Sequence, residues 1–239
     1  MLSEAKLMTI KINLLSMIAT FVMLMTTMAV KANPVDGILS DCMACHAVSE
    51  PSEMTLDERM KRIGPSLFYA GNKYQAIWLE KWLQNPTRLF PAGVYYGEHT
   101  VVTDEGDIVL ETDLVTHPKL DQQQAQEVTR ALFKLKANSE IVADLEVGEI
   151  KKVSQRMGSL NFRKFKGCAS CHQDAEGDGG VSGPELYTAF ERFQLTYLIS
   201  YMQNPQAWEP KSLMPNQHLK QKDVEKLVGY LKTLSEDKP

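Results

Sequence analysis

Hydrophobic residues follow three patterns along the chain, and each pattern predicts a different element. A continuous apolar run extends from Ile12 to Val30. Farther on, apolar residues share one face of two predicted helices, Trp78, Leu79, Trp82 and Leu83 in the first and Tyr197, Leu198, Tyr201 and Met202 in the second. The segment HTVVTDEGDIVLET (99–112) instead alternates around Asp-Glu-Gly-Asp, which predicts a β-hairpin. These patterns together predict a mainly α fold with one hairpin.

The apolar run at 12–30 has the features of a secretory signal. Lys6 and Lys11 precede it, and VKA at 30–32 has small residues where a signal peptidase cuts, so we expect cleavage after Ala32. A run of about 20 apolar residues is also close to the length that spans a bilayer, so an uncleaved membrane anchor is the alternative. In both cases we expect an exported, periplasmic protein.

Composition narrows the class of protein. The chain has 239 residues, of which 44% are hydrophobic and 23% charged, with a formal net charge of −4. These values are typical of a globular acidic protein, and they indicate neither disorder nor nucleic-acid binding. We therefore expect no nucleic-acid partner.

All four cysteines lie in two copies of one short motif, C-x-x-C-H. The copies are Cys42, Cys45 and His46, and Cys168, Cys171 and His172. This motif attaches c-type haem, because two thiols bond to the vinyl groups at one porphyrin edge and the adjacent imidazole reaches the iron. A single copy could also be a zinc or redox pair. Two copies in an exported chain with no other cysteine favour two covalently bound haem c groups.

An internal repeat follows the two motifs. Residues 64–86 align with 183–205 without a gap and share nine identical residues, including Gly-Pro at the start and Gln-Asn-Pro at the end. Proline disfavours helix in the residue before it, so the aromatic helix of each copy should end at Asn-Pro. Each half thus has C-x-x-C-H, then G-P-x-L, then an aromatic helix, which indicates two haem domains in tandem.

With these motifs, both halves resemble class I cytochrome c domains. The second is especially similar to the monohaem cytochrome domains that accompany haem-copper oxidases and nitric-oxide reductases, through GSLNFRKFKGCASCH, GPELY, NPQAWEPKSLMPN and DVEKLVGYLKTL within residues 158–234. The resemblance is weakest at 87–116. It implies two tandem class I cytochrome c domains with a β-hairpin insertion in the first. The expected boundaries are 1–32 for the signal, 33–138 for domain 1, 139–150 for a linker and 151–239 for domain 2.

The resemblance also implies roles for individual residues. The motif histidines, His46 and His172, are the expected proximal iron ligands, and the carbonyls of Pro65 and Pro184 are the expected acceptors for their second N–H. A metal-bound histidine needs such an acceptor to fix its tautomer, and a rigid Gly-Pro turn can supply one. Met214 is the expected distal ligand of the second haem, and a thioether ligand raises a haem potential.

The first half has no methionine for the distal position. Met54 and Met60 both precede the Gly-Pro turn, on the wrong side of the expected pocket. The remaining candidates are His99 and His117, and an open, five-coordinate iron is the further alternative.

An alignment of the last helices favours His117. Residues 120–135 align with 219–234, which places His117-Pro118 within two residues of Met214-Pro215. His99 falls instead within the long insertion between Pro86 and His117. We therefore predict His117 as the distal ligand of haem 1.

Two surface features remain open at this stage. The insertion is either a surface loop without a function or an element that shields the haem edge or docks a partner. The basic residues before the second motif form either a solvated helix face or a docking surface for an acidic partner; they are Lys151, Lys152, Arg156, Arg163, Lys164 and Lys166.

The leading functional hypothesis is a periplasmic electron carrier rather than an enzyme. Electrons would pass from a low-potential bis-histidine haem 1 to a higher-potential His/Met haem 2 and on to a redox partner protein. One alternative is a diheme peroxidase-like enzyme or another haem oxidoreductase, such as a thiosulfate-oxidising diheme enzyme. Another is a subunit through which electrons enter a membrane oxidase or reductase complex.

Overall fold

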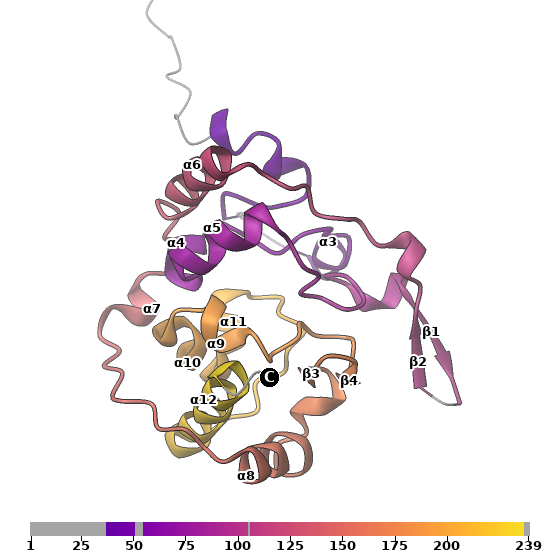
Figure 1. Cartoon of the computed structure of the whole chain (residues 1–239), viewed down its shortest axis with the longest axis vertical. Coiled ribbons are helices and arrows are strands. Elements are labelled where there is room, and N and C mark those ends of the chain that lie inside the picture. The colour runs from indigo at the N-terminus through magenta and orange to yellow at the C-terminus, as the bar shows by residue number, and fades with distance from the viewer. Residues whose placement is uncertain (1–36, 51–54, 105, 237–239) are drawn as a thin grey trace, which may run out of the picture. The chain divides into compact units, whose positions relative to one another are not determined.

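Helices make up most of the regular structure, as the apolar periodicity predicts. The computed structural model describes residues 37–50, 55–104 and 106–236 (Figure 1). The predicted signal segment at 1–32 lies outside these residues. No helix within the described ranges is both long and apolar enough to cross a membrane.

The first half, residues 37–138, consists of short helices and one hairpin. Its elements are η1 (Cys42–Ala44), α3 (Leu56–Met60), α4 (Ala70–Lys73), α5 (Ala76–Gln84), η2 (Tyr96–Glu98), β1 (Thr100–Thr103), β2 (Gly106–Val109), η3 (Glu111–Asp113) and α6 (Gln122–Leu132). Reciprocal hydrogen bonds between Asp121 and Gln124 form a capping box that fixes the start of α6. Helix α5 ends at Gln84, directly before Asn-Pro, as predicted.

The second half, residues 151–236, follows a short helix, α7 (Glu140–Ala143). Its elements are α8 (Gln155–Ser159), the π-helix η4 (Leu160–Phe165), η5 (Cys168–Ser170), β3 (Gln173–Ala175), β4 (Asp178–Gly179), α9 (Ala189–Arg192), α10 (Leu195–Gln203), α11 (Pro205–Trp208) and α12 (Gln221–Glu236). Helices α8 and α12 pack closely at Gly158, where a Cβ would lie 2.0 Å from the ring of Tyr230. Only glycine permits this approach.

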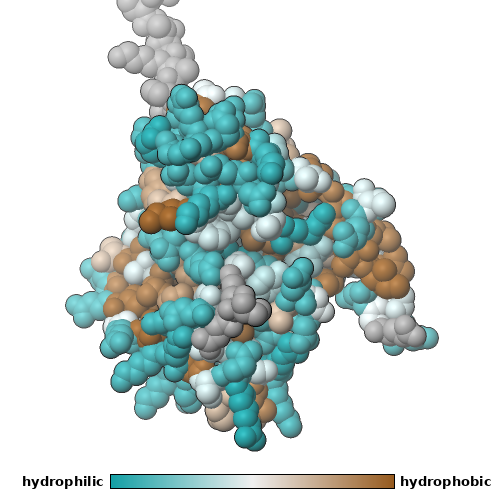
Figure 2. Space-filling model, in the orientation of Figure 1, coloured by the Kyte–Doolittle hydropathy of each residue, from teal (hydrophilic) through white to brown (hydrophobic). Residues whose placement is uncertain are grey.

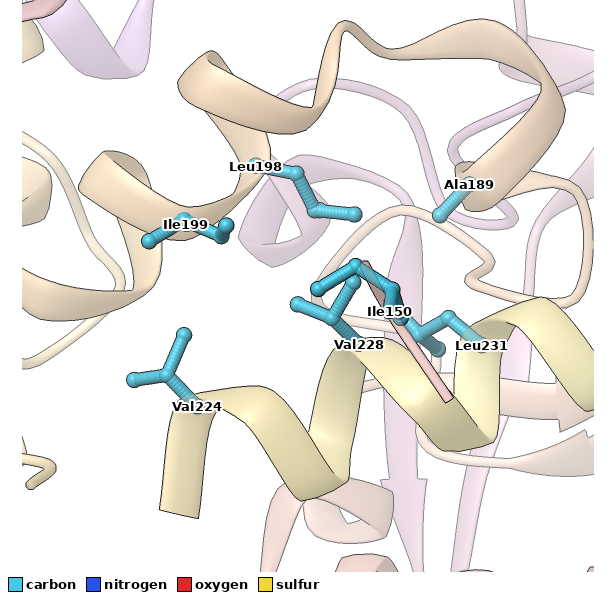
Figure 3. Packing of buried hydrophobic residues seen from close by; sticks show 7 residues of the cluster. All are labelled: Ile150, Ala189, Leu198, Ile199, Val224, Val228 and Leu231. Atoms are coloured by element: carbon cyan, nitrogen blue, oxygen red, sulfur yellow. The ribbon is translucent and has the colours of Figure 1, made fainter. Parts of the chain in front are cut away.

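The core of the second half lies between α10 and α12. Figure 3 shows its buried residues, which are Ile150, Ala189, Leu198, Ile199, Val224, Val228 and Leu231. Leu198 and Ile199 come from α10 and face the residues of α12, whose apolar positions recur at helical spacing. Ile150 joins this core from the segment that we predicted as a linker, so the end of that segment packs against the second half.

Two antiparallel sheets complete the part of the chain that the structure describes. In the segment where alternation predicts a hairpin, β1 pairs with β2, with Val101 opposite Ile108. The second sheet, β3 with β4, was not predicted from the sequence. Its tight turn uses Gly177 and Gly179 at positive φ, a conformation that glycine adopts without steric cost.

The two repeats meet at equivalent residues. Tyr74 and Phe193 form an isolated antiparallel bridge. The backbone N–H of Gln75 donates to the carbonyl of Arg192 at 2.8 Å, and that of Gln194 donates to the carbonyl of Lys73 at 2.9 Å. A buried cluster beside the bridge draws on both halves, with Phe68, Tyr69, Tyr197 and Trp208. Contacts group Ile38–Pro239 into one compact unit, so the division into two domains stays a prediction.

Candidate functional site

Each C-x-x-C-H motif folds as one turn of 3₁₀-helix, η1 in the first half and η5 in the second. Residues three apart lie on the same side of such a helix, so the two cysteines of each motif face the same way. The backbone N–H of each following histidine donates to the first cysteine, His46 to Cys42 at 2.9 Å and His172 to Cys168 at 3.0 Å. The two motifs therefore present their thiols and imidazole in the same arrangement.

The first thiol of each motif does not resemble a reactive redox thiol. All four cysteines are free, and burial raises the pKa of Cys42 and raises that of Cys168 to about 11. Reactive redox cysteines have lowered pKa values instead. Within the described residues, no group of three or more His, Cys, Asp or Glu side chains could hold a metal ion. The raised pKa values disfavour the redox interpretation of the motif.

Both motif histidines are fixed by the carbonyl of the Gly-Pro proline. His46 Nδ1 lies 2.7 Å from the Pro65 carbonyl, and His172 Nδ1 lies 2.7 Å from the Pro184 carbonyl. A carbonyl only accepts, so Nδ1 carries the proton and Nε2 is free to bind a metal. Burial lowers the pKa of both histidines, which favours the neutral, metal-binding form.

The glycine of each Gly-Pro turn makes room for the imidazole. A Cβ at Gly64 would lie 2.4 Å from Cε1 of His46, and a Cβ at Gly183 would lie 2.5 Å from Cε1 of His172. Each glycine N–H also donates to the second cysteine of its motif, at 3.0 Å for Gly64 and 2.7 Å for Gly183. Each glycine therefore leaves space for the histidine ring and also bonds to the backbone of the motif that carries this histidine.

His117 is the histidine that lies opposite His46. Their ring centroids are 6.3 Å apart, with 58° between the ring planes. Two imidazoles on opposite sides of one metal have about this separation, since about 2 Å of metal–nitrogen bond and about 1 Å from nitrogen to ring centre add on each side. His117 Nδ1 lies 2.9 Å from the Pro118 carbonyl, so its Nε2 is also free. The residues of the first half therefore fit a metal centre such as haem iron.

His99 lies elsewhere in the insertion. A Cβ at Gly93 would be 2.8 Å from Cδ2 of His99, and Leu114 contacts the same space. His99 Nδ1 is buried without a hydrogen-bond partner in the described structure, whereas its backbone carbonyl accepts from Leu110 at 2.8 Å. His99 therefore packs at the base of the hairpin.

The loop that carries Met214 is held by hydrogen bonds from two helices. The backbone N–H of Met214 donates to Ser212 Oγ at 3.3 Å, and Ser212 Oγ lies 2.9 Å from the hydroxyl of Tyr201 on α10. Gln206 on α11 donates to the Met214 carbonyl at 2.9 Å. Sequence reasoning missed this support, although Tyr201 aligns with Trp82 in the repeat. Met202, by contrast, packs against the apolar clusters of the second half, as expected for a helix-face residue.

A continuous row of aromatic rings connects the two candidate sites. Trp82 lies 4.7 Å from His117, measured between ring centroids, and Tyr201 contacts the loop of Met214 through Ser212. Successive ring centroids between them are 5.3 to 6.0 Å apart, in the order Trp82, Trp78, Tyr74, Phe193, Tyr197 and Tyr201. The row crosses the junction of the halves at Tyr74 and Phe193, and the residues on its two sides are equivalent in the repeat.

Equivalent positions of the repeat also carry two buried cations. Arg192 is 1% exposed and forms an ion pair with Glu185, which is 2% exposed. Lys73 is 7% exposed, and its Nζ lies 5.1 to 5.7 Å from the ring centroids of Tyr69, Tyr74, Phe193 and Tyr197. After burial, the main cause, these charges contribute to the lowered pKa values of His46 and His172. The sequence signal for these buried cations was the alignment of Lys73 with Arg192 in the repeat.

Half of the basic residues before the second motif are neutralised within the chain. Lys152 pairs with Glu236 at 2.9 Å, and Lys166 pairs with Asp223 at 2.8 Å. Arg163 pairs with both Asp174 and Asp178. This run therefore presents much less positive charge than its sequence suggests.

Comparison with known proteins identifies part of the chain. A family model described as Cytochrome c matches residues 158–235. No curated protein and no solved structure matches the chain. The second half thus contains a cytochrome c domain, which supports a c-type cytochrome with covalently bound haem c. Such domains are typical of electron carriers and are usually extracellular or periplasmic.

Proposed function

We propose that the chain is a periplasmic diheme cytochrome c that carries electrons from a bis-histidine haem 1 to a His/Met haem 2 and on to a redox partner. The observation that carries this proposal is the separation of His46 and His117, whose ring centroids lie 6.3 Å apart. That separation suits one metal bound between two imidazoles.

The likeness of the two motifs supports a haem in the first half, which the family model does not cover. The Nδ1–carbonyl distance is the same in both, and both histidine rings fill the space beside the glycine of a Gly-Pro turn. The arrangement of the motif histidine, the proline carbonyl and the glycine lies within a cytochrome c domain in the second half. The same arrangement is present in the first half.

Each residue has a defined task in this proposal. Cys42 and Cys45 would attach haem 1, and Cys168 and Cys171 would attach haem 2. His46 and His117 would hold the iron of haem 1, and His172 and Met214 would hold that of haem 2. Bound haem supplies reversible one-electron chemistry at its iron. With two protein ligands for each iron, no coordination site would be left for a substrate, which favours electron transfer over catalysis.

The two axial pairs give the transfer a direction. A methionine ligand raises a haem potential relative to a second histidine, so bound haem 2 would have the higher potential and would accept electrons from haem 1. The row of rings between Trp82 and Tyr201 supports transfer within one molecule, because it provides an unbroken packed path between the sites. The proposal places the mature protein in the periplasm, either free or held by residues 12–30.

Low-temperature EPR with near-infrared magnetic circular dichroism tests the proposal on the purified oxidised protein. We expect two low-spin haems per chain, one with the bis-histidine and one with the histidine–methionine signature. A haem-to-protein ratio of one would contradict the diheme assignment. Rapid cyanide binding or peroxide turnover would instead indicate an open iron and favour a peroxidase-like enzyme.

A further inference from the structure

The hairpin β1–β2 exposes apolar side chains on both of its faces. Val101 and Ile108 are cross-strand partners on one face and are 47% and 57% exposed. Val102, on the other face, is 80% exposed. Figure 1 shows the two strands extending beyond the helices, and Figure 2 shows hydrophobic surface continuing onto them. A two-stranded hairpin with this much exposed apolar surface is typical of a site that another molecule covers.

Acidic residues lie next to these apolar residues along the chain. Between Leu89 and Pro118 the chain has six aspartate and glutamate residues and no lysine or arginine. Asp104, Asp107 and Glu111 are exposed, and within the described residues none of the three forms an ion pair. The hairpin therefore combines an apolar centre with an uncompensated negative rim.

The negative rim selects among possible occupants. A second copy of the chain would bring two acidic hairpins together, and an anionic lipid surface would repel the rim. A protein with a basic rim around an apolar patch complements it in both respects. Transient complexes of redox proteins have small interfaces, and complementary charges steer their association.

The hairpin also belongs to the segment that supplies the candidate distal ligand of haem 1. The strands lie between His99, whose carbonyl closes the base of the hairpin, and His117. A partner bound here would contact the segment that leads to His117, the proposed ligand of the haem that receives electrons first in the proposed direction.

We propose that the hairpin surface, formed by Val101, Val102, Asp104, Asp107, Ile108 and Glu111, docks a basic electron-donor protein of haem 1. This inference rests on the proposed electron-carrier function. It interprets the insertion as a docking element and predicts that the partner is basic.

The test uses stopped-flow reduction of the intact holoprotein by a reduced lysine-rich cytochrome c and, separately, by an acidic one, both chosen with midpoint potentials below that of haem 1. The rate with the basic probe should fall as salt is added. In the triple variant Asp104→Asn, Asp107→Asn and Glu111→Gln, we expect about a tenfold slower rate at low salt and a weaker salt dependence. The matched control, Asp144→Asn, Glu146→Gln and Glu149→Gln, makes the same charge change at exposed positions outside the hairpin and should stay within about twofold.

The apolar centre is tested by Val101→Ser with Ile108→Ser, which should slow the basic probe at high salt as well. A redox titration of every variant checks that both haem potentials are retained. Equal rates for the two triple variants would overturn the docking surface and leave the carrier function intact. Hairpin-dependent dimerisation in sedimentation velocity would overturn it in favour of a second copy. Failure of the unaltered protein to exchange electrons with either probe would instead overturn the carrier function.

Discussion

Tyr74 and Phe193 hold the same position in the two repeats and pair with each other. They form an antiparallel bridge, their ring centroids lie 5.8 Å apart, and the hydrogen bonds on either side of them are reciprocal. The side chains of Gln75 and Gln194 repeat this reciprocity, since each donates to a backbone carbonyl of the opposite repeat. A contact in which equivalent residues exchange bonds is the signature of a local two-fold axis.

Removing the ring at this junction should destabilise the protein. Tyr74→Ala removes a side chain that is 6% exposed, and we expect a loss of about 3 kcal/mol in the free energy of unfolding. Tyr96→Ala makes the same change at a side chain that is 37% exposed and should cost less than about 1 kcal/mol. Urea unfolding followed by far-UV circular dichroism measures both, and similar losses would contradict a stabilising junction.

The glycine beside His46 should be required for haem 1. In Gly64→Ala, the new Cβ would overlap the imidazole, so His46 or the Gly-Pro turn has to move. We expect loss of the haem 1 low-spin EPR signal while that of haem 2 persists. Gly148→Ala is the control, because nothing lies within 4 Å of its added Cβ. An unchanged haem 1 signal in Gly64→Ala would show that the turn yields without disturbing the ligand.

Replacement of the candidate distal ligand should move one potential only. His117→Met exchanges an imidazole for a thioether, which should raise the lower of the two midpoints by about 100 mV or more. A redox titration followed in the visible bands measures both midpoints. His99→Ala serves as the comparison and should leave them in place. If His99→Ala moves the lower midpoint and His117→Met does not, the ligand is His99.

The buried ion pair of Glu185 and Arg192 should be costly to break. Glu185→Gln leaves an uncompensated guanidinium at a side chain that is 1% exposed, and we expect a loss of about 3 to 5 kcal/mol. Glu236→Gln breaks the exposed pair with Lys152 and should cost less than about 1 kcal/mol. Chemical unfolding of the two variants under the same conditions makes the comparison. Equal effects would mean that Arg192 finds another anionic partner.

The free energy of unfolding should decrease at alkaline pH, in part because of the ionisation of Tyr69. Burial, followed by neighbouring Tyr197 and Glu209, raises the pKa of Tyr69 well above its ordinary value. The folded state thus retains this proton after the unfolded chain loses it near pH 10, so the stabilisation is present below about pH 10 and declines above it. In Tyr69→Phe, the free energy of unfolding should decrease less steeply with pH, by up to about 1.4 kcal/mol per pH unit. Urea unfolding between about pH 9 and 11 tests this, and parallel curves would contradict it.

Features encoded by neighbouring residues were predictable from the sequence. The helix ends at Gln84 and Gln203 follow from the proline that comes next but one, and the strands at 100–109 follow from alternation. The Gly-Pro turns could be placed near the histidines because the resemblance to class I cytochrome c domains implies it, and the need of a metal-bound imidazole for an acceptor agrees with it. These are local rules, and each needs only a few residues.

Features that depend on distant contacts were not predictable in this way. Tyr74 and Phe193 have the pattern of core residues within their own halves, and nothing in either segment indicates that they face each other. The link from Tyr201 through Ser212 to Met214 depends on how a loop folds back onto α10. The cage of rings around Lys73 draws on both repeats, so neither repeat alone contains the information for it.

The reciprocal contact at Tyr74 and Phe193 is also the kind by which two separate copies of a small protein would form a homodimer. Placing the two repeated segments in one chain keeps them at a high effective concentration however dilute the protein becomes. It also lets the two segments differ, since a substitution in a homodimer is always made twice. Lysine at 73 with arginine at 192 is a difference of this kind, and the proposed ligands His117 and Met214 would be another. Covalent linkage thus permits a polarity between the two segments that identical subunits cannot have.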